Sequence, residues 1–419
     1  MPSLEERRPR ACAYDRRVTA PPTPTPRRNR SIDGSRFALR ASGPWERVGE
    51  LLGELHEAGL RRVSVQEVLD GADRVGRALD RTEPPLAAIQ QPVLTGFGWD
   101  FEDATTTRWY PQGITSTHDA SDDGLWAGRE VVLVSWVLGR NSSVRVSFCE
   151  LTAGASPRYC HVLLAEPVRR WGREAIELKP IRLHAGGIVW RGPHLYVADT
   201  LRGLRVFAID EMLEVARTSA PGCVGYREGR WYGAGHRYVM PQVGALRMGL
   251  VRSIIDRGPR FSFLSLGRGV DGASDSVISG EYRARQPGAR LVSWPLFGEE
   301  EGLRAGATVQ ASSALTTGRT NLQGALPIGN HLLLASSGGG RRGSGRLAVY
   351  ERERLAADRP WATGPEDLAY LPARDLVLSL TEHAPGADSE RAGRLVFGLS
   401  AQALIGGADE GGETEAETG

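Results

Sequence analysis

Polar side chains stand just before a short apolar segment at five places along the chain. The set contains one imidazole, two carboxylates and several amides: Gln112, His184, Gln242, Asn321 with Gln323, and Glu366 with Asp367. Carboxylate and amide oxygens can coordinate a hard divalent cation, and an imidazole beside carboxyls can orient water against an ester or glycosidic bond. We take His184, Glu366 and Asp367 as candidate catalytic residues and the amides as candidate binding residues. The alternative is that the amides bind neighbouring backbone and tie adjacent units together.

The apolar segments belong to a repeat of short strands separated by turns. The clearest copy opens at Gly186-Gly187 and continues with "HLYVADT" (194–200) and "GLRVFAID" (203–210). Further copies open near Pro111, Asn321 and Pro365, and a degenerate one runs through 238–244, 261–266 and 290–294. One such unit cannot bury both of its faces, so the units must stack or form a ring. We predict an all-β chain folded as a β-propeller with five blades, six being the alternative because the copies are unevenly spaced.

A propeller would gather the polar residues, because the first strand of every blade lines the central channel. Only the fifth copy, with Glu366 and Asp367, brings carboxylates to the axis. The ring must also close without an open edge. We therefore predict that a strand from the segment Gln91 to Gly98 completes the last unit.

The strand pair "HLYVADT" and "GLRVFAID" resembles the blades of the NHL, SMP-30 and YncE-like propeller superfamily over residues 92–405. The successive openings "WYPQGIT", "HAGGIVW", "TNLQGALPI" and "GPEDLAY" are similar to those of uncharacterised propeller-like proteins of high-GC actinobacteria. The resemblance implies either a binding protein or a channel-site hydrolase or lyase with a metal held by Glu, Asn and Asp. The pattern of one acid per specified blade is not met here, so a divalent cation is an option and no cofactor is firmly implied.

The two ends of the chain differ from the repeat region. Residues 1–43 form an arm whose first 40 residues contain ten arginines, four acids and a Pro/Thr run, and residues 406–419 contain five acids and no base. Both compositions are typical of disordered segments. Between arm and repeats, residues 44–82 show helical spacing, with a capping box at Ser64 to Glu67 opening a second run that reaches Leu79. We predict a helical hairpin there and the propeller over 92–405.

Charge and hydropathy exclude some function classes. With 52 basic and 50 acidic residues the formal charge is +2, too small to attract nucleic acid or an anionic membrane. No apolar segment is long enough to span a bilayer or to serve as a signal peptide. We expect a cytoplasmic location by default, or secretion if translation starts elsewhere. We expect a monomer, with a small molecule, a glycan or a protein bound at the channel mouth.

Three weaker candidates remain. Cys149 and Cys160 lie on two strands of a predicted hairpin, where they form either a cross-strand disulfide or two buried thiols. The segment 117–123 gathers one histidine and three aspartates, which we expect in a solvated turn. Glu382 and His383 follow a predicted strand, but no G-x-S-x-G motif supports a serine hydrolase.

Overall fold

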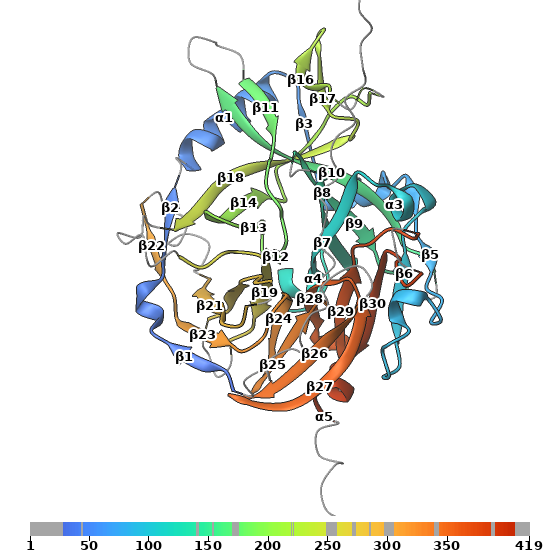
Figure 1. Ribbon diagram of the computed structural model, residues 1–419. Helices are drawn as coiled ribbons and strands as arrows, with labels where there is room; N and C mark the ends of the chain where they lie inside the picture. Colours follow the sequence, from blue (N-terminus) through green and yellow to red (C-terminus); the bar gives the residue numbers. More distant parts are fainter. Residues whose placement is uncertain are drawn as a thin grey trace, which may run out of the picture.

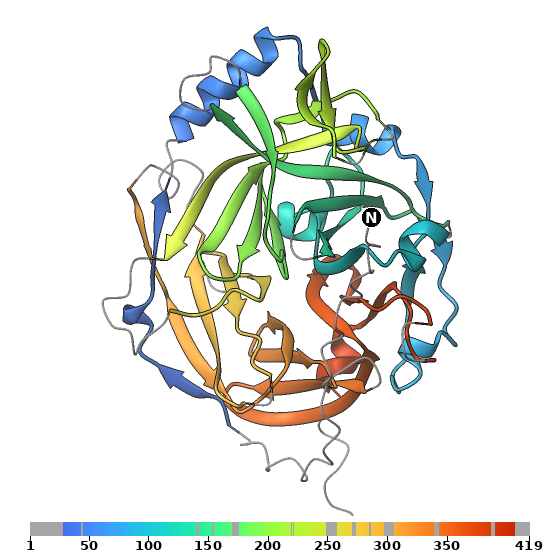
Figure 2. The ribbon, with the colours of Figure 1, turned by 45° about the horizontal axis from the view of Figure 1, so that its top comes forward.

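The computed structural model describes most of the chain between residues 28 and 406. The described residues are 28–42, 45–139, 142–152, 155–169, 176–218, 220, 222–248, 258–269, 274–284, 286–296, 306–338, 343–386 and 390–406. They are mostly β-structure, in several antiparallel sheets around a central region (Figures 1 and 2). Residues 1–27 and 407–419, the larger part of the two predicted disordered ends, lie outside the described residues.

The sheets are built from five units of antiparallel strands. Units 1 and 2 are β7 (Trp109–Ser116), β8 (Val131–Leu138), β9 (Val144–Glu150) and β10 (Arg158–Arg169), then β12 (Ile188–Arg191), β13 (His194–Asp199), β14 (Gly203–Ala208) and β18 (Tyr238–Met248). Unit 3 is β19 (Phe263–Gly267), β20 (Ser276–Gly280), β21 (Ala289–Pro295) and β23 (Ser313–Thr317). Units 4 and 5 are β24 (Leu322–Ile328), β25 (His331–Ser336), β26 (Ser344–Glu351) and β27 (Arg354–Thr363), then β28 (Pro365–Leu371), β29 (Leu376–Thr381), β30 (Leu395–Ser400) and β6 (Thr95–Gly98).

The first strands of the units lie next to one another around the centre of the molecule. β7 contacts β12, β12 contacts β19, β19 contacts β24, β24 contacts β28, and β28 contacts β7. This closed series follows the chain, and Figure 1 shows these strands nearest the middle. The arrangement fits the radial β-structure that the repeat predicts.

Glycine allows the first strands to approach so closely. A Cβ atom on Gly187 would lie 2.0 Å from the backbone nitrogen of Leu264 at the start of unit 3. A Cβ atom on Gly113 would lie 2.8 Å from the Cα atom of Gly187. Real Cβ atoms need more room than either distance, because close-packed interiors cannot absorb an added carbon. The glycines that mark the repeat are therefore the places where neighbouring units touch through their backbones.

The predicted strand assignments hold for units 1, 2, 4 and 5, and the third needs correction. The segment beginning at Tyr238 is not the first strand of a unit, because β18 pairs with β14 and forms the outer strand of unit 2. It also pairs in parallel with β10, which joins units 1 and 2. The first strand of the next unit is β19. The predicted closure is confirmed, since β6 pairs antiparallel with β30 and completes unit 5.

Residues 28–98 run around the outer edges of the units, and we call this segment the N-terminal belt. A bridge joins Arg28 to Arg354 in unit 4, β1 (Arg30–Ile32) pairs with β23 in unit 3, and β2 (Ala38–Ser42) pairs with β18 in unit 2. Next, β4 (Arg74–Val75) pairs with β10 in unit 1, and β5 (Arg77–Ala78) pairs with β6 in unit 5. The belt thus contacts all the units, as its blue colour in Figures 1 and 2 shows.

The belt corrects two predictions. Residues 28–42 are ordered, although their polar composition predicts disorder. The reason is that β1 pairs with β23 and β2 pairs with β18, and the edges of sheets offer unpaired backbone groups for such hydrogen bonds. The second helix is shorter than predicted: α1 (Trp45–Glu57) and α2 (Val65–Asp70) form, the latter with the predicted capping box, but β3 (Arg61–Val63) lies between them. After Gly71 the chain pairs with β10 and β6, and Val75 is exposed.

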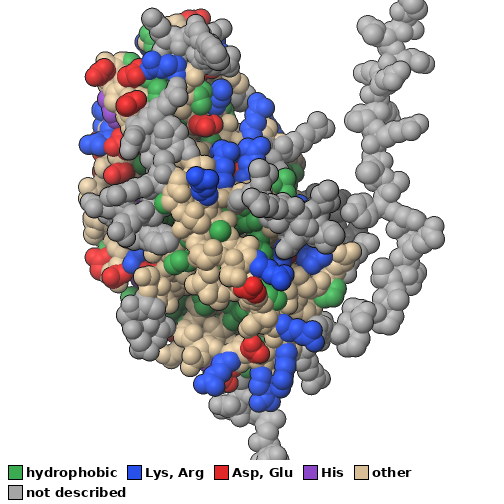
Figure 3. Space-filling view, turned by 90° about the vertical axis from the view of Figure 1, so that its left-hand side faces the viewer, with side chains coloured by type: hydrophobic (Ala, Val, Ile, Leu, Met, Phe, Trp, Pro, Cys, Tyr) green, Lys and Arg blue, Asp and Glu red, His purple; other side chains and the backbone are tan. Residues whose placement is uncertain are grey.

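The face that carries β1 and β2 shows both basic and acidic side chains (Figure 3).

The remaining described elements are short. They are α3 (Phe101–Thr105), α4 (Thr117–Ala120), α5 (Ala401–Gly406), η1 (Gly34–Arg36), η2 (Pro84–Leu86), η4 (Pro372–Arg374), β11 (Ile176–Pro180), β15 (Met212–Glu214), β16 (Val224–Arg227), β17 (Arg230–Gly233) and β22 (Thr308–Gln310). Among the described residues, no helix has the length and apolar character needed to cross a membrane.

Candidate functional site

The structure brings most of the predicted ring residues onto or beside the first strands. Gln112 lies in β7, Gln323 in β24, and Glu366 and Asp367 in β28. His184 and Asn321 precede β12 and β24, and Asn321 has a left-handed backbone with φ of 55°. Gln242 is the exception, because it lies in the outer strand β18, where its Oε1 accepts a hydrogen bond from Arg205 at 3.2 Å. The prediction that Gln242 faces the axis is therefore wrong.

Hydrogen bonds join the amides of the ring to acidic side chains. Gln323 Nε2 donates to Glu366 Oε1 at 2.8 Å, and Gln112 Nε2 donates to Glu382 Oε2 at 2.7 Å. Glu382 Oε1 also lies 3.2 Å from His383 Nδ1. From the sequence, Glu382 was predicted only to lie at the end of a strand. The signal that places it in the ring is the hairpin β28–β29, whose register pairs Pro365 with Thr381 and so returns the chain to the ring.

Both predicted carboxylates of the ring are buried and hold protons strongly. Burial raises the pKa of Glu366 well above its usual range, and the nearby Glu382 and Asp367 raise it further. Burial also raises the pKa of Asp367 well above its usual range, although backbone N–H groups of Leu368, Ile114 and Ile188 oppose the rise. Asp367 Oδ1 accepts a hydrogen bond from the backbone N–H of Leu368 at 3.0 Å, whereas Oδ2 is buried without a hydrogen-bond partner among the described residues.

His184 lies within the electrostatic influence of Glu382, the carboxylate that also acts on Glu366. Its side chain is exposed, while desolvation by nearby protein atoms lowers its pKa against the pull of Glu382. No group of three or more His, Cys, Asp or Glu side chains in the described parts of the chain is arranged to hold a metal ion.

Glu366→Gln is expected to make stability less dependent on pH. A raised pKa in the folded state means that, above the ordinary value of 4.5, the folded protein binds more protons than the unfolded chain. The free energy of unfolding then falls with rising pH by about 1.4 kcal/mol per pH unit until the folded-state pKa is reached. The amide would remove this slope and still accept the Gln323 hydrogen bond. Urea unfolding between pH 5 and pH 8 should show that the free energy of unfolding of the variant rises relative to that of the parent as the pH increases.

The control for this experiment is Glu57→Gln in α1, where the side chain is exposed. Its free energy of unfolding should follow that of the parent at every pH. Parallel curves for Glu366→Gln and the parent would contradict the assignment of a buried, protonated Glu366.

The opposite end of the first strands is covered by α4. Thr117 to Ala120 form a buried helical turn, so the predicted solvated turn is wrong for His118 and Asp119 and holds for the exposed Asp122 and Asp123. Thr115 Oγ1 donates to Asp119 at 2.8 Å, and Arg268 from unit 3 lies 3.0 Å from the same carboxylate. Asp119 can be buried because Arg268, which is distant in sequence, pairs with its carboxylate, and the local sequence gives no sign of this partner.

The two central cysteines are free thiols. Cys149 pairs with Tyr159, and Cys160 pairs with Phe148 in the β9–β10 register. They occupy neighbouring positions of the ladder, so their side chains point to opposite faces of the sheet. The buried-thiol alternative is the one observed.

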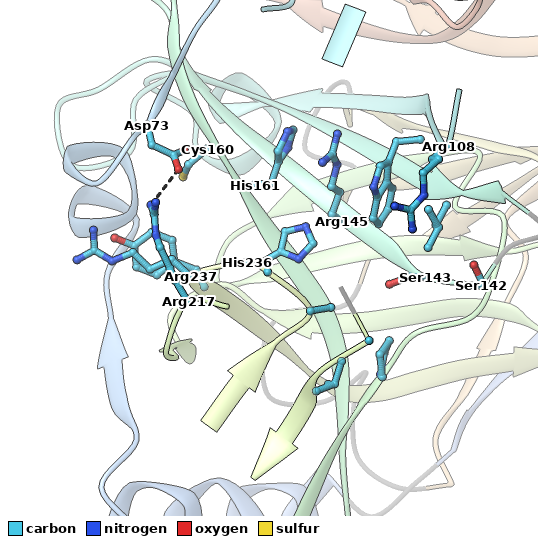
Figure 4. A pocket seen from close by; sticks show the side chains of 18 of the residues that line it. Asp73, Arg108, Ser142, Ser143, Arg145, Cys160, His161, Arg217, His236 and Arg237 are labelled. Atoms are coloured by element: carbon cyan, nitrogen blue, oxygen red, sulfur yellow. Dashed lines mark hydrogen bonds and ion pairs between the residues drawn. The ribbon is translucent and has the colours of Figure 1, made fainter. Parts of the chain in front are cut away.

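A cavity of about 500 Å³ lies away from the axis, between unit 1 and the β16–β17 hairpin (Figure 4). Its ionisable lining is nearly all basic: Arg74, Arg108, Arg145, Arg182, Arg217, Arg237, His161 and His236, with Asp73 as the one acidic residue among the described lining residues. Trp109, Ser142 and Ser143 complete one end. This cavity could not be predicted from the sequence, because its lining residues come from separate segments that share no motif.

Asp103, in α3 behind the cavity, organises the inner wall. Its Oδ1 lies 2.5 Å from Arg145 Nη2, and its Oδ2 accepts hydrogen bonds at 2.8 Å from both Tyr159 and His161. Arg74 Nη1 lies 3.3 Å from Oδ2. Burial alone would raise the pKa of Asp103, but the His161 hydrogen bond and the arginine charges hold it below its usual range. Asp103 is thus the buried counterion of this wall.

Ser147, His161 and Asp103 form a chain that resembles a hydrolytic triad only in residue types. Trp136 Nε1 donates to Ser147 Oγ at 2.7 Å, and Ser147 Oγ lies 2.9 Å from His161 Nδ1. Ser147 is fully buried and does not line the cavity, so its hydroxyl cannot meet a ligand bound there. Burial lowers the pKa of His161 to about 3, so the ring is neutral at pH 7 and fits the chain as donor to Asp103. The arrangement fixes the wall.

Part of the lining keeps unused hydrogen-bonding capacity. Arg217 pairs with Asp73 at 2.9 Å, and Arg237 pairs with Glu214 at 2.7 Å. In the described regions no carboxylate pairs with Arg108 or Arg182. Burial lowers the pKa of His236 to about 4, so this residue adds no charge at pH 7. The cavity therefore has two arginines, Arg108 and Arg182, whose charge no carboxylate in the described part of the chain compensates.

Comparison of the chain with protein-family models and with curated proteins found no match.

Proposed function

We propose that the protein is a five-bladed β-propeller of the NHL, SMP-30 and YncE-like type and that it acts as a non-catalytic binding protein. Units 1 to 5 would be the blades, with β6 closing the ring. The ligand is a small anionic molecule held in the cavity beside unit 1. The observation that carries this proposal is the lining of that cavity, which has six arginines and one acid among the described residues.

The charge balance supports an anionic ligand. Four of the six arginines face protein carboxylates, whereas no carboxylate of the described residues pairs with Arg108 or Arg182. A concave site with uncompensated positive charge concentrates anions, and its low-dielectric walls strengthen the attraction. The volume suits a small molecule, since ligand sites commonly measure about 300–1,000 Å³. The overall charge of the chain is near neutral, so the field is local.

Two observations favour binding over the alternative of a channel-site hydrolase or lyase that uses His184, Glu366 and Asp367. Glu366 and Asp367 are 3% and 0% exposed, so neither carboxyl is open to a substrate. Asp367 Oδ1 is already occupied by the backbone N–H of Leu368, at 3.0 Å.

Anion-dependent thermal stabilisation tests the proposal. Citrate, inorganic phosphate and adenosine 5′-monophosphate would be compared with glucose at equal ionic strength. An anion at about 100 times its Kd should add about 2.7 kcal/mol to the free energy of unfolding. The double variant Arg108→Gln/Arg182→Gln should weaken binding at least about tenfold, because each removes a charged hydrogen-bond donor.

The matched control is Arg81→Gln/Arg202→Gln, which changes the net charge equally at exposed positions outside this cavity. It should bind like the parent. Equal weakening by both double variants would show a non-specific charge effect and would contradict the proposed site.

A further inference from the structure

We propose that the end of the cavity formed by Ser143 and Arg145 binds a phosphoryl group, and that the ligand is a phosphate monoester carrying a planar ring. This inference rests on the proposed function and specifies the ligand of the same cavity. Figure 4 shows Arg108, Ser142, Ser143 and Arg145 together at one end, and Asp73, Arg217 and Arg237 at the other.

Arg145 is held rigidly and keeps one donor unused. Its side chain is 7% exposed, and its Nη2 is committed to Asp103. Its guanidinium lies 4.5 Å from the ring centroid of Trp109 and 5.0 Å from that of Trp136. Its Nε atom is buried without a hydrogen-bond partner among the described residues. A buried charged donor is strongly destabilised when unpaired, so this atom is poised to meet an acceptor from outside the chain.

Ser143 supplies a second unused group at the same end. Its residue is 7% exposed, and its Oγ is likewise buried without a partner in the described structure. Ser143 directly precedes β9, and Arg145 is the second residue of that strand. Residues two apart in an extended strand point to the same face. Two unpartnered polar groups therefore share one face, and both line the cavity.

The donor pattern fits a phosphoryl group better than a carboxylate. A carboxylate is matched by the two-pronged face of one guanidinium, but Arg145 already spends Nη2 on Asp103. A phosphoryl group presents three oxygens in a tetrahedral arrangement and accepts from several separate donors. Arg145 Nε, Ser143 Oγ and the uncompensated Arg108 are three such donors.

The neighbouring wall is aromatic. Trp109 and His236 lie edge to face with centroids 6.0 Å apart, and His161 lies 6.5 Å from His236. His236 Nδ1 is bound to the Gly233 carbonyl at 2.9 Å, which fixes the ring. Flat, neutral rings favour a planar group by stacking or edge contact. The phosphoryl end and this wall together suit an aromatic phosphate ester.

Titration with adenosine 5′-monophosphate, followed by calorimetry and by the phosphorus NMR signal, tests the inference. Ser143→Ala should weaken binding about tenfold, since a hydrogen bond to a charged group is lost. The melting temperature of the free variant should equal that of the parent, because Oγ has no partner to lose. Ser156→Ala, outside the cavity, is the control and should bind like the parent.

Two results would overturn the inference and leave the proposed function intact: equal affinity in Ser143→Ala and the parent, or citrate binding as tightly as the phosphate ester. Arg108→Gln/Arg182→Gln would still weaken binding in both cases. Absence of binding by every anion would overturn the inference and the proposed function together.

Discussion

Replacing Asp103 with alanine is expected to lower the free energy of unfolding by about 3–5 kcal/mol, since removing one member of a buried ion pair strands the other. Asp103 is almost fully buried and neutralises Arg145 while accepting from Tyr159 and His161. The substitution would leave the Arg145 charge buried and several donors unpaired. Urea unfolding at pH 7 provides the measurement.

Asp122→Ala is the control, because Asp122 is 95% exposed and contacts only Arg191 among the described residues, at 3.3 Å. It should change stability by less than about 0.5 kcal/mol. Asp103→Asn should fall between parent and Asp103→Ala, since an amide keeps one acceptor but no charge. A loss below about 1 kcal/mol in Asp103→Ala would show that the wall does not depend on this counterion.

Gly187→Ala should be among the most damaging single-methyl additions at the described glycines, with a loss above about 3 kcal/mol or failure to fold. The new carbon would lie 2.0 Å from the nitrogen of Leu264 and 2.5 Å from the carbonyl carbon of Phe263. Both atoms are backbone in the next unit, so no side chain can swing away. Soluble yield and thermal unfolding would measure the effect.

Gly53→Ala in α1 is the matched substitution, because nothing lies within 4 Å of the added carbon. Alanine favours an exposed helix position over glycine by about 1 kcal/mol, so this variant should be slightly more stable than the parent. If Gly187→Ala folded with parental stability, neighbouring units would not meet through their backbones there.

The strands were predictable because their signals are local. Short apolar runs near glycine or proline mark β8, β13 and β25, and Ser64 with Glu67 marks the start of α2. The closing role of β6 was also predictable, since a ring requires a partner for the last unit. These features depend on neighbours in sequence or on a general rule.

The incorrect predictions concern residues whose positions depend on contacts between segments that are distant in sequence. Gln242-Val243-Gly244 has the composition of an opening strand, but β14 takes β18 as its outer neighbour. The candidate cavity was even less predictable from the sequence. Arg108, Ser143 and His236 share no motif, and only the fold brings their segments to one place. Burial of Glu366 and Asp367 likewise depends on packing that the polar pattern does not reveal.

The N-terminal belt determines the order in which this molecule can be completed. Its segment is synthesised long before several of its partners: β1 pairs with β23 (Ser313–Thr317), Arg28 with Arg354, and β6 with β30 (Leu395–Ser400). Contacts that span most of a chain form slowly, because the loop between them must close first. The belt must therefore wait for β30 before all of its pairings can form.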